Sequence, residues 1–146
     1  MNWQKMSIER LKEYEARQSA LILIPEQIRT LETSFTAIRA ARTDGEPVKE
    51  SRGNKREDAL LSNIAKRQEL ETNLKIAERE AEITAQGLSI LTPEEREVLY
   101  KFYVSRPRNH VEKLCEELNF EKTRVYEIKD IALRKFTRAV YGVVEI

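Results

Sequence analysis

The residues best suited to chemistry in this sequence are basic and polar side chains that gather near the carboxyl end. Residues 119–138 hold six Lys or Arg against three Asp or Glu, whereas the whole chain of 146 residues has a formal net charge of +1. A local excess of this kind fits contact with phosphate groups, because Lys and Arg neutralise the backbone of DNA. The pattern therefore predicts a binding surface for double-stranded DNA.

Contacts with bases are expected from the start of this segment. Arg124 could grip the O6 and N7 atoms of guanine, and Thr123 or Tyr126 could touch a base or a phosphate. Glu127 and Asp130 would repel phosphates, so they must accept from cytosine N4, pair with Lys or Arg along a helix, or lie outside the contact. Other Lys and Arg side chains are expected to meet the DNA backbone. The candidate DNA-binding residues are Lys122, Thr123, Arg124, Tyr126, Glu127, Lys129, Arg134, Lys135, Arg106 and Arg108.

Other kinds of site have few residues to build on. Cys115 and His110 are the single Cys and the single His, too few for a structural zinc site or a disulfide framework. We expect no catalytic site, no metal site and no cofactor. The longest apolar run, residues 20–24, ends at Pro25 and is too short to span a membrane, and the amino terminus has no apolar signal core. These features predict a soluble cytoplasmic protein without a membrane partner.

Helices must position the basic segment, because the chain is rich in helix formers and holds only four Gly and four Pro. From residue 92 onward the apolar spacing predicts three helices, at residues 94–104, 110–118 and 122–141. Thr92, Pro93 and Glu95 match a capping box that starts the first of them. Asn119 can take the left-handed conformation that ends the second, followed by a tight turn at residues 119–121. Two short helices joined by such a turn are a helix-turn-helix, whose second helix lies in the major groove.

Two longer helices are predicted before residue 92. The first covers residues 7–42, with a kink or break near Ile24 because Pro25 removes a backbone donor. The second covers residues 58–90, with Asp58 as its N-cap. The polar segment between them, residues 43–57, is interpreted as a solvated loop, although its basic side chains could touch phosphate. We therefore expect an all-α protein in which residues 1–91 form a long antiparallel, coiled-coil-like hairpin and residues 92–146 form the DNA-binding domain.

The carboxyl-terminal part resembles a known DNA-binding module. The stretch that carries the resemblance reads LTPEEREVLYKFY and then VEKLCEELNFEKTRVYEIKDIALRKF. It is similar to region 4 of the sigma-70 family, which recognises the promoter −35 element, over about residues 91–137. The resemblance implies that residues 122–138 are the recognition helix. The sequence departs from that family at Asn119, where glycine is usual, and at Glu121, where a serine N-cap is usual.

The whole chain resembles a narrower family. The opening MNW and IERLKEYEARQ, the middle PVKESRGNKREDALL and the ending ALRKFTRAVYG are similar to small phage and prophage proteins of Gram-positive bacteria. These are the autolysin-regulatory-protein (ArpU-like) late transcriptional regulators. The resemblance implies a DNA-binding activator of late phage genes in the cytoplasm of a bacterial host.

Three functions remain open at this stage. The first is a sequence-specific transcription regulator whose hairpin, residues 1–91, forms a homo-oligomer or contacts RNA polymerase. The second is a small terminase-like recognition subunit for phage DNA packaging, which a ring-shaped oligomer would favour. The third is a helical protein-interaction module without a DNA role, which salt-sensitive binding to duplex DNA would exclude.

Overall fold

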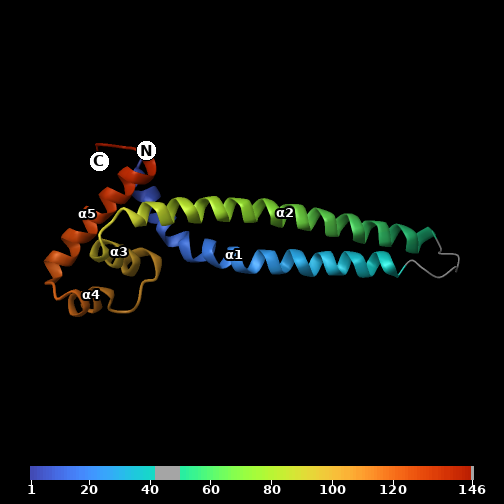
Figure 1. The fold of residues 1–146 in the computed structure, drawn as a ribbon, viewed down its shortest axis with the longest axis horizontal. Coiled ribbons are helices and arrows are strands. Elements are labelled where there is room, and N and C mark those ends of the chain that lie inside the picture. Colours follow the sequence, from blue (N-terminus) through green and yellow to red (C-terminus); the bar gives the residue numbers. More distant parts are fainter. Residues whose placement is uncertain (42–49, 146) are drawn as a thin grey trace. The chain divides into compact units, whose positions relative to one another are not determined.

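The computed structural model describes residues 1–41 and 50–145, and this part of the chain is all-α, without a strand (Figure 1). Two long helices come first, α1 (Trp3–Ala40) and α2 (Glu50–Ser89). They are followed by α3 (Pro93–Leu99), a π-helical segment η1 (Tyr100–Val104), α4 (His110–Leu118) and α5 (Lys122–Tyr141). The all-α fold class is confirmed, and the bounds of α4 and α5 agree with those predicted from the apolar spacing.

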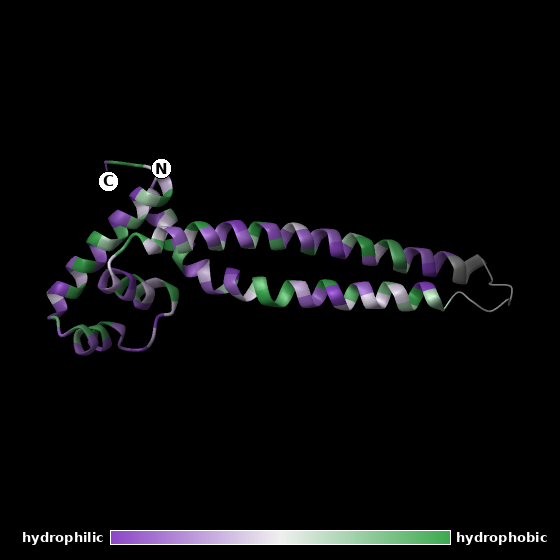
Figure 2. Cartoon of the chain, in the orientation of Figure 1, coloured by the Kyte–Doolittle hydropathy of each residue, from purple (hydrophilic) through white to green (hydrophobic). Residues whose placement is uncertain are grey.

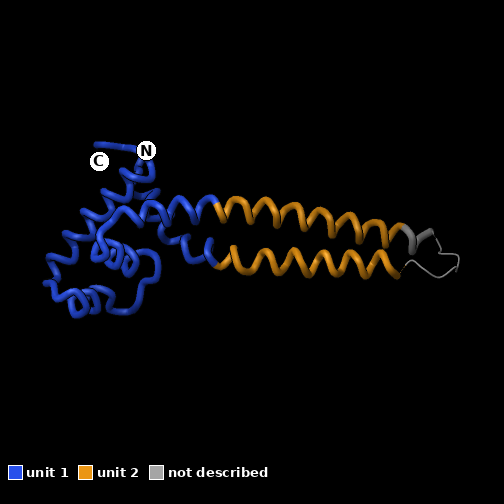
Figure 3. Tube along the Cα trace, in the orientation of Figure 1, with its two compact units in different colours: residues 1–18, 79–146 blue, residues 19–78 orange. Residues whose placement is uncertain are grey.

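The chain separates into two compact units, and both long helices contribute to each of them (Figure 3). Unit 1 contains Met1–Gln18 and Arg79–Ile146, and unit 2 contains Ser19–Glu78. The helices after residue 92 thus share a compact unit with the start of α1 and the end of α2. A domain boundary at residue 92 would cut through this packing.

Unit 2 is an antiparallel pair of helical segments. The Asn63 side-chain amide donates to the carbonyl oxygen of Leu31 at 2.8 Å, and the Arg56 guanidinium donates to that of Ile38 at 3.1 and 3.2 Å. The earlier residue of α2 meets the later residue of α1, so the two segments run in opposite directions. Hydrophobic and hydrophilic residues alternate along both helices (Figure 2), and most apolar side chains of the seam are only half-buried.

Helix α1 continues through Pro25, so of the kink or break predicted near Ile24, the break is wrong. Proline leaves the carbonyl of Leu21 without its usual N–H partner, which costs about 3 kcal/mol in a helix interior. The flanking turns are held by packing, since Ile24 is buried and the following apolar residues Ile28 and Leu31 are half-buried. The helix therefore tolerates the proline beside a buried Ile24 and half-buried neighbours.

Helix α2 begins at Glu50, eight residues before the predicted N-cap Asp58. Residues 50–57, predicted as loop, are helical, and the remainder of the predicted loop, residues 43–49, lies outside the described residues. Glu, Lys and Arg favour this extension, and a single Gly53 opposes it by only about 1 kcal/mol. The bonds from Arg56 to Ile38 hold the added turns against α1.

Unit 1 has a core to which both long helices contribute. Its first apolar cluster joins Leu11 of α1 and Leu88 of α2 to the buried residues Leu91, Leu99, Val104, Ala132, Leu133 and Phe136. Its second cluster joins α3, η1, α4 and α5 through Val98, Phe102, Val111, Leu114, Val125 and Ile128. The second cluster fixes α5 against α4, and the first fixes the later part of α5 on the ends of the long helices.

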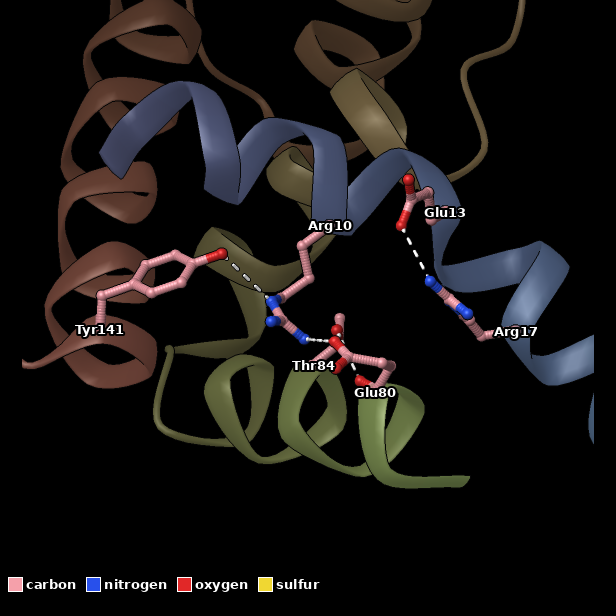
Figure 4. A network of polar contacts seen from close by, with 6 residues as sticks. All are labelled: Arg10, Glu13, Arg17, Glu80, Thr84 and Tyr141. Atoms are coloured by element: carbon pink, nitrogen blue, oxygen red, sulfur yellow. Dashed lines mark hydrogen bonds and ion pairs between the residues drawn. The ribbon is translucent and has the colours of Figure 1, made fainter. Parts of the chain in front are cut away.

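Polar contacts hold the same three helix ends together (Figure 4). The Arg10 guanidinium of α1 forms an ion pair with Glu80 of α2, and its Nε donates to the Tyr141 hydroxyl of α5 at 3.3 Å. A buried hydroxyl pair, Ser7 and Thr137, adds a 2.8 Å hydrogen bond between α1 and α5. These contacts fix the carboxyl end of α5, while its amino end lies at the candidate site.

Candidate nucleic-acid interface

The turn between α4 and α5 is the element that presents the candidate site. Asn119 has φ 59° and ψ 37°, the left-handed conformation predicted for it, and α5 starts three residues later at Lys122. Glu121 is extended at the N-cap and its side chain makes no capping hydrogen bond. Since α4 and α5 also share the second apolar cluster, they are two packed helices joined by a tight turn, at the bounds that the apolar spacing predicted.

The first half of α5 has one buried face and one exposed face. Val125 and Ile128 are buried in the core, as their spacing predicted. Five candidate residues on the other side are exposed to solvent: Lys122, Thr123, Arg124, Tyr126 and Glu127. The start of α1 packs on the later part of α5, through Ser7 and Thr137, and leaves these five side chains accessible.

Arg124 and Glu127 form an ion pair along the exposed face. Arg124 Nη1 lies 3.3 Å from Glu127 Oε2, one turn further along α5. This is one of the three roles that the sequence left open for Glu127. The acidic side chain therefore offsets part of the positive charge that Arg124 brings to the surface.

Lys129 differs from the other candidates because it is turned toward the protein. Its side chain is 21% exposed, its Nζ lies 2.8 Å from Asp130 Oδ1, and it lies 5.9 Å from the ring centroids of both Phe102 and Tyr126. Burial lowers the pKa of Lys129, but the hydrogen bond to Asp130 and neighbouring charges outweigh it and leave the pKa raised. Lys129 is a charged group held inside an aromatic cluster.

The segment before α4 adds a second row of cations beside α5. Arg106 and Arg108 are exposed and, with His110, Lys122 and Tyr126, line an open hollow of about 510 Å³. Arg106 Nε donates to His110 Nδ1 at 3.3 Å. Burial and the nearby Arg106 charge lower the pKa of His110, which favours the neutral imidazole that can accept this bond. Arg106 and Arg108 therefore lie beside the start of α5.

The later cations of α5 divide into two kinds. Arg134 is exposed, in keeping with its predicted place on the outer face. Lys135 Nζ lies 2.9 Å from Oε1 of the buried Glu95, which also belongs to the capping box with Thr92 that the sequence predicted. Burial raises the pKa of Glu95, but the bonds from Lys135 and Thr92 outweigh it and leave the pKa lowered. Lys135 thus joins α5 to the start of α3.

Sequence reasoning did not identify the aromatic cluster on which Tyr126 rests. The Phe102 ring lies 4.7 Å from that of His110 and 5.7 Å from that of Tyr126, both edge-on. Phe102 belongs to η1, a segment predicted as the end of an ordinary α-helix. The sequence did contain one indication of this cluster. Tyr126 and Lys129 stand three residues apart and therefore lie on one side of a helix.

Comparison of the chain with protein-family models, with curated proteins and with solved structures finds no match. Within the residues that the structure describes, no helix is both long and apolar enough to cross a bilayer. The same residues contain no group of three His, Cys, Asp or Glu side chains placed to hold a metal ion. The fold and the residues of α5 are thus the basis for assigning a function.

Proposed function

We propose that this chain is a DNA-binding transcription regulator of phage or prophage genes, which inserts α5 into the major groove and acts by binding rather than by catalysis. The observation that supports it is the exposed first half of α5, which carries Lys122, Arg124 and Tyr126 immediately after a sharp left-handed turn. Base edges are recognised by such donors on an unobstructed helix. The phage context comes from the sequence resemblance.

Base and phosphate contacts are divided among the exposed residues. Thr123 and Arg124 face the bases, whereas Arg106, Arg108 and Arg134 meet the backbone, where contacts set position and not sequence. Arg124 must leave Glu127 to bind guanine. An exposed intrahelical pair contributes about 0.3–0.5 kcal/mol, whereas a bidentate contact with guanine contributes about 1–3 kcal/mol, so the guanine contact prevails.

Selection of bound sequences from random duplexes tests the proposal. The wild-type chain should enrich one short motif, and Arg124→Ala should relax the preference at one guanine and weaken binding by about 1–3 kcal/mol in a titration followed by fluorescence anisotropy. Lys75→Ala, which removes an exposed cation from unit 2, is the matched control and should bind like the wild type. Equal binding of all duplexes, or an Arg124→Ala variant that behaves like the control, would contradict the proposal.

The hairpin of unit 2 is the proposed contact with a second copy of the chain. Ile22 and Leu23 of α1 are 71% and 57% exposed, and Leu23 borders an open groove of about 650 Å³ whose lining includes Leu31 and Leu70. A dimer predicts a selected site with two half-sites about 34 Å apart, one turn of DNA. Sedimentation measures the oligomer: a ring would favour the packaging role, and a monomer would favour contact of the hairpin with RNA polymerase.

A further inference from the structure

Tyr126 is the exposed aromatic residue of α5, and its ring contacts two neighbouring side chains, Phe102 and Lys129. It remains 41% exposed, although its ring lies edge-on to Phe102, with 5.7 Å between centroids and 74° between planes. Phe102 is buried and also packs edge-on against His110. One part of the Tyr126 ring is therefore fixed on a buried support while the rest faces solvent.

Lys129 adds a second support, from within α5 itself. Its ammonium group lies 5.9 Å from the centroids of both Phe102 and Tyr126, in the range where a cation is attracted by an aromatic ring. The bond of 2.8 Å to Asp130 fixes the ammonium in this place. A Lys that contacted phosphate would instead extend into solvent, as the exposed Lys122 does.

The π-helical segment η1 carries Phe102 and is closed by a bond from Ser105 N to Tyr100 O at 2.9 Å. Phe102 and Val104 stand two residues apart and so point to nearly opposite sides of the segment. Both are nevertheless buried, because η1 packs between the two apolar clusters. Val104 joins the first apolar cluster while Phe102 joins the second and supports Tyr126.

We propose that Lys129 and Phe102 are positioning residues that hold the Tyr126 ring in one orientation, and that this ring determines base preference by apolar contact with the 5-methyl group of a thymine. The inference rests on the proposed DNA-binding function. An aromatic ring offers an apolar body at the level of the groove wall, and apolar side chains recognise thymine through its methyl group. The cations beside Tyr126, Arg108 and Lys122, are free to take the flanking phosphates.

A double-mutant cycle between protein and DNA tests the contact. The probe is the duplex selected by the wild-type chain, in which each thymine is replaced in turn by uracil, so that only the 5-methyl group is lost. One replacement should weaken wild-type binding about fourfold, the effect of burying one methyl group. The same replacement should leave Tyr126→Ala unaffected, whereas Tyr126→Phe should keep the fourfold loss because the ring is retained.

Two measurements on variants of Lys129 test its role: the salt dependence of DNA binding and the preference for thymine. A phosphate contact would lower the slope of log K against log salt by about 0.9 when Lys129 is replaced by Met. We expect Lys129→Met to keep the wild-type slope and to lose the thymine preference, and Lys129→Arg to restore that preference because a guanidinium also packs on aromatic rings. A lowered slope with the preference intact would overturn the positioning role.

A measurement without DNA separates this inference from the proposed function. In the free protein, the ε-methylene protons of Lys129 should show an upfield ring-current shift that falls in Tyr126→Ala and in Phe102→Leu. If the heteronuclear NMR spectrum of Phe102→Leu shows that this variant is unfolded, the shift in Tyr126→Ala decides the test. A wild-type chain that binds no duplex refutes the DNA-binding function. Duplex binding that is indifferent to every thymine methyl group, or the absence of the shift in the wild type, refutes only the inference about Tyr126.

Discussion

At the scale of single residues, Gly87 lies where α2 closely approaches α5. A Cβ atom at this position would lie 2.7 Å from Cε2 of Phe136 and 2.7 Å from Cγ2 of Val140. Phe136 is fully buried in the first apolar cluster, so its ring has little freedom to move away. Glycine is required here by the close approach of two helices rather than by its backbone conformation.

We expect Gly87→Ala to lower the free energy of unfolding by about 1 kcal/mol. Alanine gains about 1 kcal/mol of helix propensity, but overpacking in a core costs about 1–3 kcal/mol and outweighs that gain. Urea denaturation followed by circular dichroism measures the difference. Gln86→Ala, at the exposed neighbouring position, is the control and should change stability by less than about 0.5 kcal/mol. A Gly87→Ala variant as stable as the wild type would show that the side chains of Phe136 and Val140 move away from the added methyl group at little cost in free energy.

Glu95 makes the stability of the protein depend on pH. Its pKa is lowered in the folded chain, so its stabilising effect is complete above the ordinary Glu pKa of about 4.3 and is lost as the pH falls through the lowered value. Between neutral pH and that acid range, the unfolding free energy should fall more steeply in the wild type than in Glu95→Gln. Lys135→Met should flatten the curve too, whereas Lys113→Met, an exposed lysine of α4, should not. Equal acid sensitivity of wild type and Glu95→Gln would contradict this account.

The sequence predicted the exposure of residues in α5 well and their partners poorly. Val125, Ile128 and Ala132 repeat at helical spacing, so the face opposite them, with Lys122 and Arg124, had to be exposed. The position of Lys129 depends on Phe102, and the ion pair of the exposed Lys135 depends on Glu95. Both partners reach α5 only through tertiary packing. Periodicity contains no information about such contacts.

At the scale of helices, the start of α5 is less well capped than the start of α3. Thr92 and Glu95 satisfy the first turn of α3 reciprocally, whereas Glu121 leaves the first turn of α5 without a side-chain acceptor. The extended backbone of Glu121, φ −73° and ψ 157°, is nevertheless the conformation of an N-cap residue. A short hydroxyl side chain at this position could therefore accept from the backbone of α5.

We expect Glu121→Ser to stabilise the protein by about 0.5 kcal/mol. A serine cap contributes about 1 kcal/mol, from which the lost attraction between the carboxylate and the helix dipole, about 0.5 kcal/mol at an exposed site, must be subtracted. Thermal unfolding followed by circular dichroism should show a small rise in the midpoint. Glu121→Ala removes the same charge without adding a cap and should lower the midpoint. If the two variants melt at the same temperature, serine forms no cap.

Element boundaries were predictable where local chemistry decides them. Asn119 and the capping box at Thr92 are local signals, and the helices beside them have the predicted bounds or start within one residue of them. The start of α2 at Glu50 was predicted wrongly, because the helix formers around Gly53 and the bonds from Arg56 to Ile38 outweigh the local turn signals. Of the kink or break predicted near Ile24, the break is absent, because α1 runs on through Pro25. The π turn at η1 likewise arises from packing on two clusters at once.

For the molecule as a whole, charge arrangement matters more than charge total. A formal net charge of +1 gives little long-range attraction to DNA. Three cations of the carboxyl-terminal segment, Arg124, Lys129 and Lys135, already face carboxylates of the chain itself. Among the candidate residues that the structure describes, the cations without an acidic partner are Arg106, Arg108, Lys122 and Arg134.

Four such cations predict a moderate dependence of DNA binding on salt. Each phosphate neutralised contributes about −0.9 to the slope of log K against log salt, so the wild-type slope should be about −4. Arg108→Gln should make the slope shallower by about 0.9, because its guanidinium is exposed beside α5. Lys135→Gln should leave the slope unchanged, because this ammonium is held by Glu95 rather than by DNA. A slope that responds equally to both substitutions would mean that Lys135 leaves Glu95 for a phosphate on binding, and the ion pair would then be a contact that opens when the protein meets its site.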